Sequence, residues 1–236
     1  MKLFEPLHLG KMHLANRIVM APLTRSRADA KTNAPGALHA TYYGQRASAG
    51  LIIAEGTSPS PNGVGYPRIP GIYSQAQIDG WRMVAESVHD KGGNLFVQLM
   101  HCGRVAHEAN LPQGAEVIAP SVVELPGEMY TDAYGMQPHT PARAMTPEDL
   151  QTTAQEYVQA AKNAVEAGCD GVEIHAANGY LLEQFIHPHT NRRKDDYGGS
   201  IQKRCRFVLE VVQQCCDAIG KEKVGIRLSP YGTFND

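Results

Sequence analysis

Five short apolar segments constrain the fold of this chain more than any other feature of its sequence. Each is rich in Leu, Val or Ile, almost continuously apolar, and bounded by Gly, Pro or polar residues. Strands buried on both faces of a sheet have this pattern, whereas strands with one solvated face alternate apolar and polar residues. The segments span residues 16–22, 50–56, 94–101, 170–176 and 223–230. We therefore expect five buried strands.

Longer segments with helical periodicity separate these apolar segments. One begins at Ser74, a second begins at Thr146 and Pro147 and ends at Gly168, and a third ends at Gly220. Ser or Thr before a helix, Pro in its first turn and Gly after its end are typical helix boundaries. Strands that alternate with helices are typically parallel and joined by right-handed crossovers. The sequence therefore predicts an α/β fold with a parallel sheet.

Two parallel folds remain, the doubly wound sheet and the (β/α)8 TIM barrel. A doubly wound nucleotide-binding fold needs a Gly-rich phosphate loop after its first strand, and residues 20–29, MAPLTRSRAD, contain no glycine. We favour the barrel, which has eight strands in about 250 residues. Only about the first five strands are present in this chain. We expect one incomplete barrel domain over residues 1–236, with a hairpin at about 3–15 and a long Gly- and Pro-rich insertion after the third strand, at about 102–145.

Composition excludes several classes of protein. Lys and Arg number 22 against 24 Asp and Glu, so no strongly basic surface is expected and nucleic acid is not a predicted partner. No apolar stretch approaches the roughly 20 residues of a membrane-spanning helix, so no membrane span is expected. The five cysteines are odd in number and form no Cys-x-x-Cys pair, which indicates reduced thiols in a cytoplasmic protein.

Polar residues that follow the fourth apolar segment are the main candidates for catalysis, because barrel enzymes place their chemistry at the C-terminal ends of strands. His175 and Asn178 are three residues apart and can both donate a hydrogen bond to one carbonyl or nitro oxygen. Tyr180 is a phenol with an ordinary pKa near 10, so it is a proton donor at neutral pH. The alternative is a structural cluster of polar groups at a strand end.

Two polar residues within other apolar segments suggest a bound cofactor. Arg227 indicates an anionic partner, since burying an unpaired guanidinium is costly. Gln98 has amide donors and an acceptor to satisfy, although hydrogen bonds to the backbone of the core are an alternative. A planar heterocycle with alternating donors and acceptors satisfies both residues.

Metal-dependent and serine-hydrolase chemistry have little support in the sequence. The only His and Cys clusters are His187 with His189 and His101 with Cys102, and neither has the spacing of a zinc site with carboxylate support. We therefore predict no metal. No Gly-x-Ser-x-Gly motif is present.

Four segments together closely resemble the Old Yellow Enzyme family of FMN-dependent NADPH dehydrogenases and ene reductases, in particular its N-ethylmaleimide reductase-like members. The resemblance runs from about Leu3 to Pro230, without the family's C-terminal third. The segments are 16–25 (NRIVMAPLTR), 51–57 (LIIAEGT), 98–104 (QLMHCGR) and 171–200 (GVEIHAANGYLLEQFIHPHTNRRKDDYGGS).

The resemblance implies a TIM-barrel flavin domain with FMN lying across its mouth. It implies that the Thr24 hydroxyl bonds a flavin carbonyl oxygen, that Gly56 lets the backbone approach the ring, and that Arg227 lies beside flavin N1. Gln98 then reads the pyrimidine edge. The full set of implied FMN contacts is Pro22, Leu23, Thr24, Gly56, Gln98 and Arg227.

The implied reaction has two halves. NADPH or NADH first reduces FMN, and an enone, enal, maleimide or nitroalkene then enters. His175 and Asn178 polarise the oxygen of this substrate, flavin N5 gives hydride to the β-carbon, and Tyr180 protonates the α-carbon.

Two other functions compete with this prediction. One is a truncated, flavin-free half-barrel that is inactive alone and works by self-association or with a complementing chain through its strand edges. The other is a flavin-free lyase or isomerase, which needs a base with a metal or a Schiff-base lysine at a strand end. No lysine lies at such a position.

Overall fold

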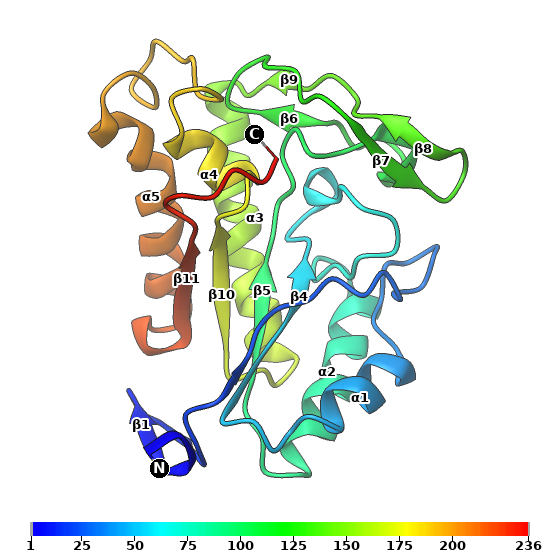
Figure 1. The fold of residues 1–236 in the computed structure, drawn as a ribbon, viewed down its shortest axis with the longest axis vertical. Helices are drawn as coiled ribbons and strands as arrows, with labels where there is room; N and C mark the ends of the chain where they lie inside the picture. Colours follow the sequence, from blue (N-terminus) through cyan, green and yellow to red (C-terminus); the bar gives the residue numbers. More distant parts are fainter. Residues whose placement is uncertain (1, 236) are drawn as a thin grey trace.

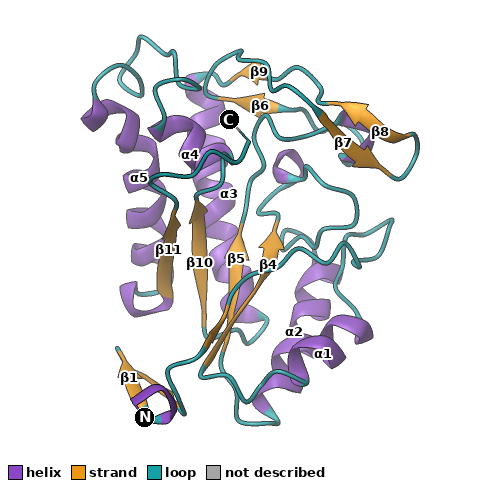
Figure 2. Cartoon of the chain, in the orientation of Figure 1, coloured by secondary structure: helices purple, strands orange, loops and turns teal. Residues whose placement is uncertain are grey.

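The computed structural model describes residues 2–235 and is built around a five-stranded parallel sheet with helices packed on one of its faces (Figures 1 and 2). Its strands lie side by side in chain order and pair in parallel, and each overlaps one of the apolar segments. A doubly wound sheet reverses its strand order at a switch point, and this sheet has no reversal. The α/β class with a parallel sheet is confirmed. The strands are β3 (Val19–Met20), β4 (Leu51–Thr57), β5 (Leu95–Leu99), β10 (Gly171–Ala176) and β11 (Val224–Leu228).

Each pair of consecutive strands is joined by helical structure. Three of the helices correspond to the predicted ones, and the Thr146 hydroxyl accepts a hydrogen bond from the Asp149 backbone N–H at the start of the second. The helices are α1 (Ala37–Gly44), α2 (Gln75–His89), α3 (Pro147–Glu166), α4 (Leu181–Ile186) and α5 (Ile201–Ile219). Short 3-10 helices occupy Lys2–Phe4, Pro61–Gly63, Glu108–Asn110 and Lys221–Lys223. Among residues 2–235, no helix combines the length and apolar character that a membrane crossing requires.

Alternate strand residues point to opposite faces of the sheet, and the two faces have different contents. Ile52, Val97 and Ile174 lie in the main hydrophobic core together with apolar residues of α2, α3, α4 and α5. We call this the outer face. Phe96 belongs instead to a smaller cluster on the opposite, inner face. The sheet therefore separates the helix-packed core on its outer face from an inner face whose side chains change in character along the strands.

The N-terminal hairpin packs on the inner face near the start of the strands. Its strands, β1 (Leu7–Leu9) and β2 (Met12–Leu14), are antiparallel, and Gly10 in the turn has a φ of +60°. Leu14 clusters with Leu51, Ile53 and Phe96. The hairpin lies at the lower end of the sheet in Figure 1. Apolar contacts thus fill the inner face at this end, and the polar inner residues lie nearer the C-terminal strand ends.

The segment between β5 and α3 forms a separate layer beyond the C-terminal strand ends (Figure 1). It contains a parallel pair, β6 (Ile118–Ala119) with β9 (Arg143–Ala144), and an antiparallel hairpin, β7 (Glu128–Thr131) with β8 (Gly135–Pro138). The sequence analysis predicted no strand here, since strands of two to four residues leave no readable periodicity.

Candidate active site

Polar side chains replace apolar ones on the inner face toward the C-terminal ends of β5, β10 and β11. Glu173 of β10 is opposite Gln98 of β5, and His175 of β10 is opposite Arg227 of β11. Gln98, Glu173 and His175 are buried, with 2%, 8% and 3% of their surface exposed. The structure therefore brings together Gln98, His175 and Arg227, which the sequence analysis singled out. It adds Glu173, which that analysis did not single out.

Glu173 is bonded to Gln98 and lies in the field of Arg227. The Gln98 Nε2 amide donates to Glu173 Oε1 at 2.8 Å. Burial raises the pKa of Glu173, while the hydrogen bond from Gln98 and the charge of Arg227 act in the opposite direction. Within residues 2–235, the Arg227 guanidinium makes no hydrogen bond and no ion pair closer than 4.0 Å. The inner face thus presents a cation that has capacity for an anionic ligand.

His175 is held as a neutral hydrogen-bond donor. Its Nδ1 accepts a hydrogen bond from the Ala177 backbone N–H at 3.3 Å, so the ring proton is assigned to Nε2. Burial, with a smaller effect from Arg227, lowers the pKa of His175 to about 3. In the described part of the chain Nε2 has no hydrogen-bond partner. An uncharged N–H donor is therefore available at the end of β10.

Tyr180 lies against His175, and its hydroxyl pairs with that of Tyr66. The rings of His175 and Tyr180 meet edge to face at 86°, with centroids 4.9 Å apart. The Tyr180 hydroxyl donates to the Tyr66 oxygen at 3.1 Å. Burial raises the pKa of Tyr66 to about 12 and raises the pKa of Tyr180 further still. Both phenols are therefore protonated at neutral pH, and the sequence analysis missed Tyr66 because its Gly-rich surroundings, NGVGYP, have no periodicity.

Asn178 occupies a turn whose backbone needs a permissive residue. Its φ is +57°, in the left-handed region that Asn tolerates better than most residues. The Asn178 N–H donates to Ser229 Oγ at 2.8 Å, and its carbonyl accepts from Asn235 Nδ2 at 2.8 Å. Ser229 Oγ in turn donates to Glu183 Oε1 at 2.7 Å. The turn is therefore fixed through its backbone, and the Asn178 side-chain amide has no partner within residues 2–235.

The segment after β3 carries three of the predicted cofactor contacts on an open surface. Leu23 is 53% exposed, Thr24 is also exposed, and Pro22 is half-buried. The next residue, Arg25, donates its backbone N–H to Glu55 Oε2 at 2.9 Å. This hydrogen bond ties the segment to β4, and the side chains of Leu23 and Thr24 remain open to a ligand.

Glu55 lies at an irregularity in β4 and is completely buried. The pairing of β4 with β5 shifts register between Ala54 and Gly56, so Glu55 is the extra residue of a β-bulge. The Tyr43 hydroxyl donates to Glu55 Oε1 at 3.1 Å and accepts from the Glu55 N–H at 2.9 Å. Burial raises the pKa of Glu55. The bulge therefore buries a carboxylate directly behind the segment after β3.

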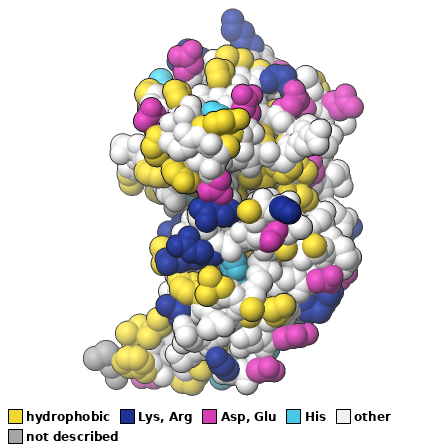
Figure 3. All heavy atoms as spheres, turned by 90° about the vertical axis from the view of Figure 1, so that its right-hand side faces the viewer, with side chains coloured by type: hydrophobic (Ala, Val, Ile, Leu, Met, Phe, Trp, Pro, Cys, Tyr) yellow, Lys and Arg dark blue, Asp and Glu magenta, His cyan; other side chains and the backbone are white. Residues whose placement is uncertain are grey.

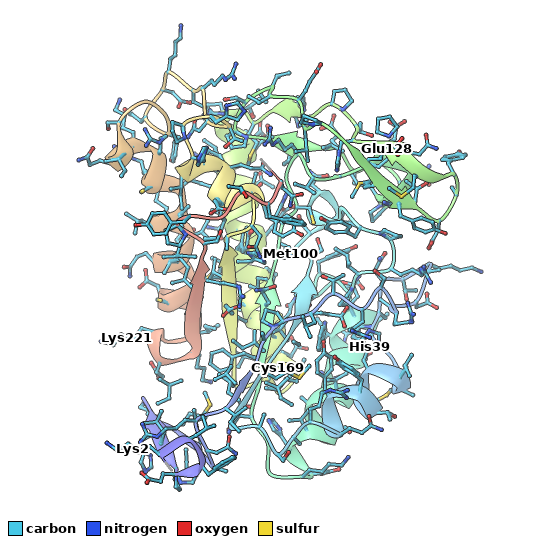
Figure 4. The ribbon with its side chains drawn as sticks, viewed as in Figure 1. Lys2, His39, Met100, Glu128, Cys169 and Lys221 are labelled. Carbon is cyan, nitrogen blue, oxygen red and sulfur yellow. The ribbon has the colours of Figure 1, made fainter. Side chains whose placement is uncertain are left out.

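Gly56, the next residue of β4, has a packing requirement of its own. A Cβ at this position would lie 2.5 Å from Met100 Cε and 2.6 Å from its sulfur. Met100 lies just past the end of β5, in the middle of the molecule in Figure 4. The resemblance to Old Yellow Enzymes implies that Gly56 lets the backbone approach a flavin ring. In the structure, the space of the missing side chain is filled by the Met100 thioether.

A basic surface adjoins this region on the side of α1 and α2. Figure 3 shows Lys and Arg side chains gathered at mid-height on that side. Arg25 and Arg46 both lie over the ring of Tyr42, with guanidinium-to-centroid distances of 5.1 and 3.9 Å. A cavity of about 150 Å³ lies beside them, lined by Arg25, Arg27, Leu38, His39 and Tyr42. His39 also faces Glu55, with Nε2 3.7 Å from Oε1.

The histidine clusters of the sequence do not form a metal centre in the part of the chain described. The rings of His187 and His189 are 6.5 Å apart, and His187 Nδ1 accepts from the His189 backbone N–H. Among residues 2–235, no group of three or more His, Cys, Asp or Glu side chains is placed to hold a metal ion.

Taken together, the fold and the site define a class of protein. A parallel α/β sheet presents at its C-terminal strand ends a neutral His donor, a protonated Tyr, and an Asn amide and an Arg guanidinium that have no hydrogen-bond partner among residues 2–235. The profile of the NADH:flavin oxidoreductase / NADH oxidase family matches residues 2–236. The chain belongs to this family, and the resemblance to Old Yellow Enzymes is confirmed.

Similar proteins have been described in several organisms. A protein of Leishmania infantum described as a probable flavin mononucleotide-dependent alkene reductase is 43% identical over 238 residues, which are 99% of this chain and 65% of that protein. Morphinone reductase in complex with tetrahydroNAD has a TM-score of 0.94 and 47% identity, with 100% of this chain and 66% of that chain covered. An Old Yellow Enzyme homologue from Zymomonas mobilis has a TM-score of 0.95 and 43% identity, with coverage of 100% and 65%. This chain therefore spans about 65% of the length of these relatives.

Proposed function

We propose that this protein is an FMN-dependent oxidoreductase that uses NADPH or NADH to reduce activated C=C bonds. The proposed substrates are α,β-unsaturated carbonyl and nitro compounds, namely enals, enones, maleimides and nitroalkenes. One observation carries the proposal: a neutral His175, whose Nε2–H has no partner among residues 2–235, lies edge to face against a protonated Tyr180 at the end of β10. This pair supplies an oxygen-polarising donor and a proton donor next to each other.

The inner face fits an FMN. Within residues 2–235 the Arg227 guanidinium and the Gln98 Oε1 have no hydrogen-bond partner, and the Gln98 Nε2 donates to Glu173 Oε1. We propose that Gln98 and Arg227 bind the pyrimidine edge of the flavin. The remaining proposed FMN contacts are Pro22, Leu23, Thr24 and Gly56. When bound, FMN supplies the two-electron redox chemistry, with the nicotinamide dinucleotide as electron source.

The proposed substrate half of the reaction uses three residues. His175 and Asn178 donate hydrogen bonds to the carbonyl or nitro oxygen, and a neutral imidazole polarises this oxygen without protonating it. Tyr180 gives the proton that completes the reduction at the α-carbon. Tyr66 lies 3.1 Å from the Tyr180 oxygen and holds this hydroxyl in place.

For the fold, we propose a (β/α)8 TIM barrel in a single domain over residues 1–236, with the N-terminal hairpin and the insertion after the third strand as parts of it. The consecutive strand order supports the barrel, as does the similarity to the Old Yellow Enzyme homologue. The cysteines are free thiols, which supports a reducing compartment, and we propose the cytoplasm.

A second candidate function is a flavin-free half-barrel that is inactive without further strands or a partner chain. The two outermost strands of the sheet favour it, because both carry exposed apolar side chains. Val19 of β3 is 48% exposed, and Ile226 and Leu228 of β11 are 43% and 58% exposed. Exposed apolar strands at a sheet edge are prone to pair with other chains.

The experiment that tests the proposed function compares the two halves of the reaction in Tyr180→Phe. Reduction of the bound flavin by NADPH is expected to stay within about twofold of the unmodified protein. Enone turnover is expected to fall by about 100-fold, the order of magnitude that a positioned proton donor contributes. Tyr197→Phe is the matched control, because its hydroxyl bonds Glu210 of α5, away from the site. Equal slowing of both halves, or no slowing of either, would exclude Tyr180 as the proton donor.

A further inference from the structure

Glu173 is a carboxylate placed where a strand residue is normally apolar. It occupies the middle of β10, with a strand on either side, and only 8% of its surface is exposed. Burying a charge is costly unless it is paired or hydrogen-bonded. Its hydrogen bond comes from a neutral amide, and no ion pair closer than 4.0 Å involves it within residues 2–235. Packing therefore gives no reason for an acid at this position.

The hydrogen bond from Gln98 to Glu173 fixes which way the Gln98 amide faces. An amide can present either its oxygen or its nitrogen to a neighbour, and a carboxylate only accepts. Because Nε2 donates to Glu173 Oε1, the Gln98 Oε1 must point elsewhere. The acid thus leaves an acceptor free on the residue proposed to read the pyrimidine edge.

The charge of Glu173 acts on the other residue proposed for that edge. Arg227 and Glu173 interact electrostatically, and the direct neighbours of Glu173 across the strands are Gln98 and Gly225. The titratable groups facing it are Arg227 and His175, and His175 is neutral. A negative charge on the buried Glu173 offsets the field of the half-buried Arg227, because Coulomb interactions of a buried charge are less screened than those in water.

We propose that Glu173 is a positioning residue of the flavin site, which orients the Gln98 amide and lowers the midpoint potential of bound FMN by opposing the charge of Arg227. The inference rests on the proposed function. Glu173 lies outside the predicted set of FMN contacts and is given two separate effects. One is on the orientation of the Gln98 amide and the other is on the redox equilibrium of bound FMN, and each is measured with a different substitution.

The charge effect is tested with Glu173→Gln, which keeps an oxygen acceptor for Gln98 and removes the charge. At a fixed solution potential near the midpoint, the ratio of reduced to oxidised bound FMN is expected to rise about tenfold, or about 30 mV for a two-electron couple. Glu210→Gln removes a charge on the outer helix α5 and is expected to leave the ratio unchanged. An unchanged ratio in Glu173→Gln would overturn the inference and leave the proposed function standing.

The orientation effect is tested with Glu173→Leu, which removes both the charge and the acceptor. Oxidised FMN is expected to bind about tenfold more weakly to Glu173→Leu than to Glu173→Gln, because Leu offers the Gln98 amide no hydrogen-bond partner, whereas Gln still offers it an oxygen acceptor. Leu is well suited to a buried strand, so Glu173→Leu is expected to fold even if Glu173→Gln does not. Equal affinities would overturn the orientation effect. Absence of FMN binding in the unmodified protein would overturn the proposed function and this inference with it.

Discussion

The ends of β10 and β3 are proposed to contact one flavin and its substrate, yet the two regions are built differently. At the end of β10, His175 and Tyr180 are buried, with 3% and 7% of their surface exposed, and Asn178 is fixed through its backbone. After β3, Leu23 is 53% exposed and the segment is tied down at the Arg25 N–H. β10 has a neighbouring strand on both sides, whereas β3 is the outermost strand. The comparison indicates that the groups proposed to polarise the substrate are held firmly by the protein, whereas the segment proposed to face the flavin is more exposed and depends more on what binds it.

The largest predicted effect removes a hydrogen-bond partner of Glu55, the residue that anchors the segment after β3. Tyr43→Phe removes the hydroxyl that donates to Glu55 Oε1 and accepts from the Glu55 N–H, leaving both buried groups without this partner. We expect a loss of about 2 to 3 kcal/mol in the free energy of unfolding, measured by urea denaturation. Tyr42→Phe is the control, because that ring is half-buried and contacts arginines through its face, and it is expected to stay within about 0.5 kcal/mol. Equal losses in the two variants would show that the buried carboxylate does not depend on Tyr43.

The next prediction distinguishes the role of the Asn178 backbone conformation from that of its side-chain amide. Asn178→Ala places a Cβ without polar atoms at a φ of +57° and is expected to cost about 1 kcal/mol of stability, whereas Asn178→Gly is expected to be nearly neutral. Both variants lose the side-chain amide, so both are expected to bind a phenol, a mimic of the polarised oxygen, about tenfold more weakly. Calorimetric titration with phenol and thermal unfolding check the two effects. Phenol affinity equal to that of the unmodified protein would remove Asn178 from the site.

A smaller effect concerns pH and the buried acid of β10. Burial raises the pKa of Glu173 in the folded protein above its pKa in the unfolded chain, so folding favours the protonated carboxyl. The stability that this preference contributes is fully present below the unfolded-state pKa of Glu173 and is lost as the pH rises through its folded-state pKa. Glu173→Gln does not titrate. The stability of this variant relative to the unmodified protein is therefore expected to increase from pH 4 to pH 7. Denaturant unfolding without FMN across this range measures it, and a constant difference would mean that Glu173 does not change charge there.

The sheet could be predicted from the sequence because buried parallel strands are nearly continuous apolar runs with sharp ends, and each of the five runs overlaps a strand. The helices with capping residues were predicted for a similar local reason. Sequence reasoning missed α1, whose N-cap Gly36 has no side chain, and α4, which has six residues. The short strands of the insertion were missed because their partners are set by tertiary contacts rather than by periodicity.

The candidate site was predictable where polar residues directly follow an apolar run, as for His175 and Tyr180. It was not predictable where the candidate residues are held by partners that are distant in sequence. Tyr66 meets Tyr180 across 114 residues, and Gln98 meets Glu173 across 75. An acid inside an apolar strand was the available signal for Glu173, and the same signal in β4 marks Glu55. Both acids are buried and hydrogen-bonded to residues from other segments.

The most direct test of the account is a titration of the protein against FMN, followed by the visible absorption spectrum of the flavin. The central claim is that Gln98, Arg227 and the segment after β3 form a flavin site on the inner face. The account predicts a saturable change from the spectrum of free FMN, with one flavin bound per chain. A spectrum that stays that of free FMN at every protein concentration would contradict it and would favour the flavin-free half-barrel.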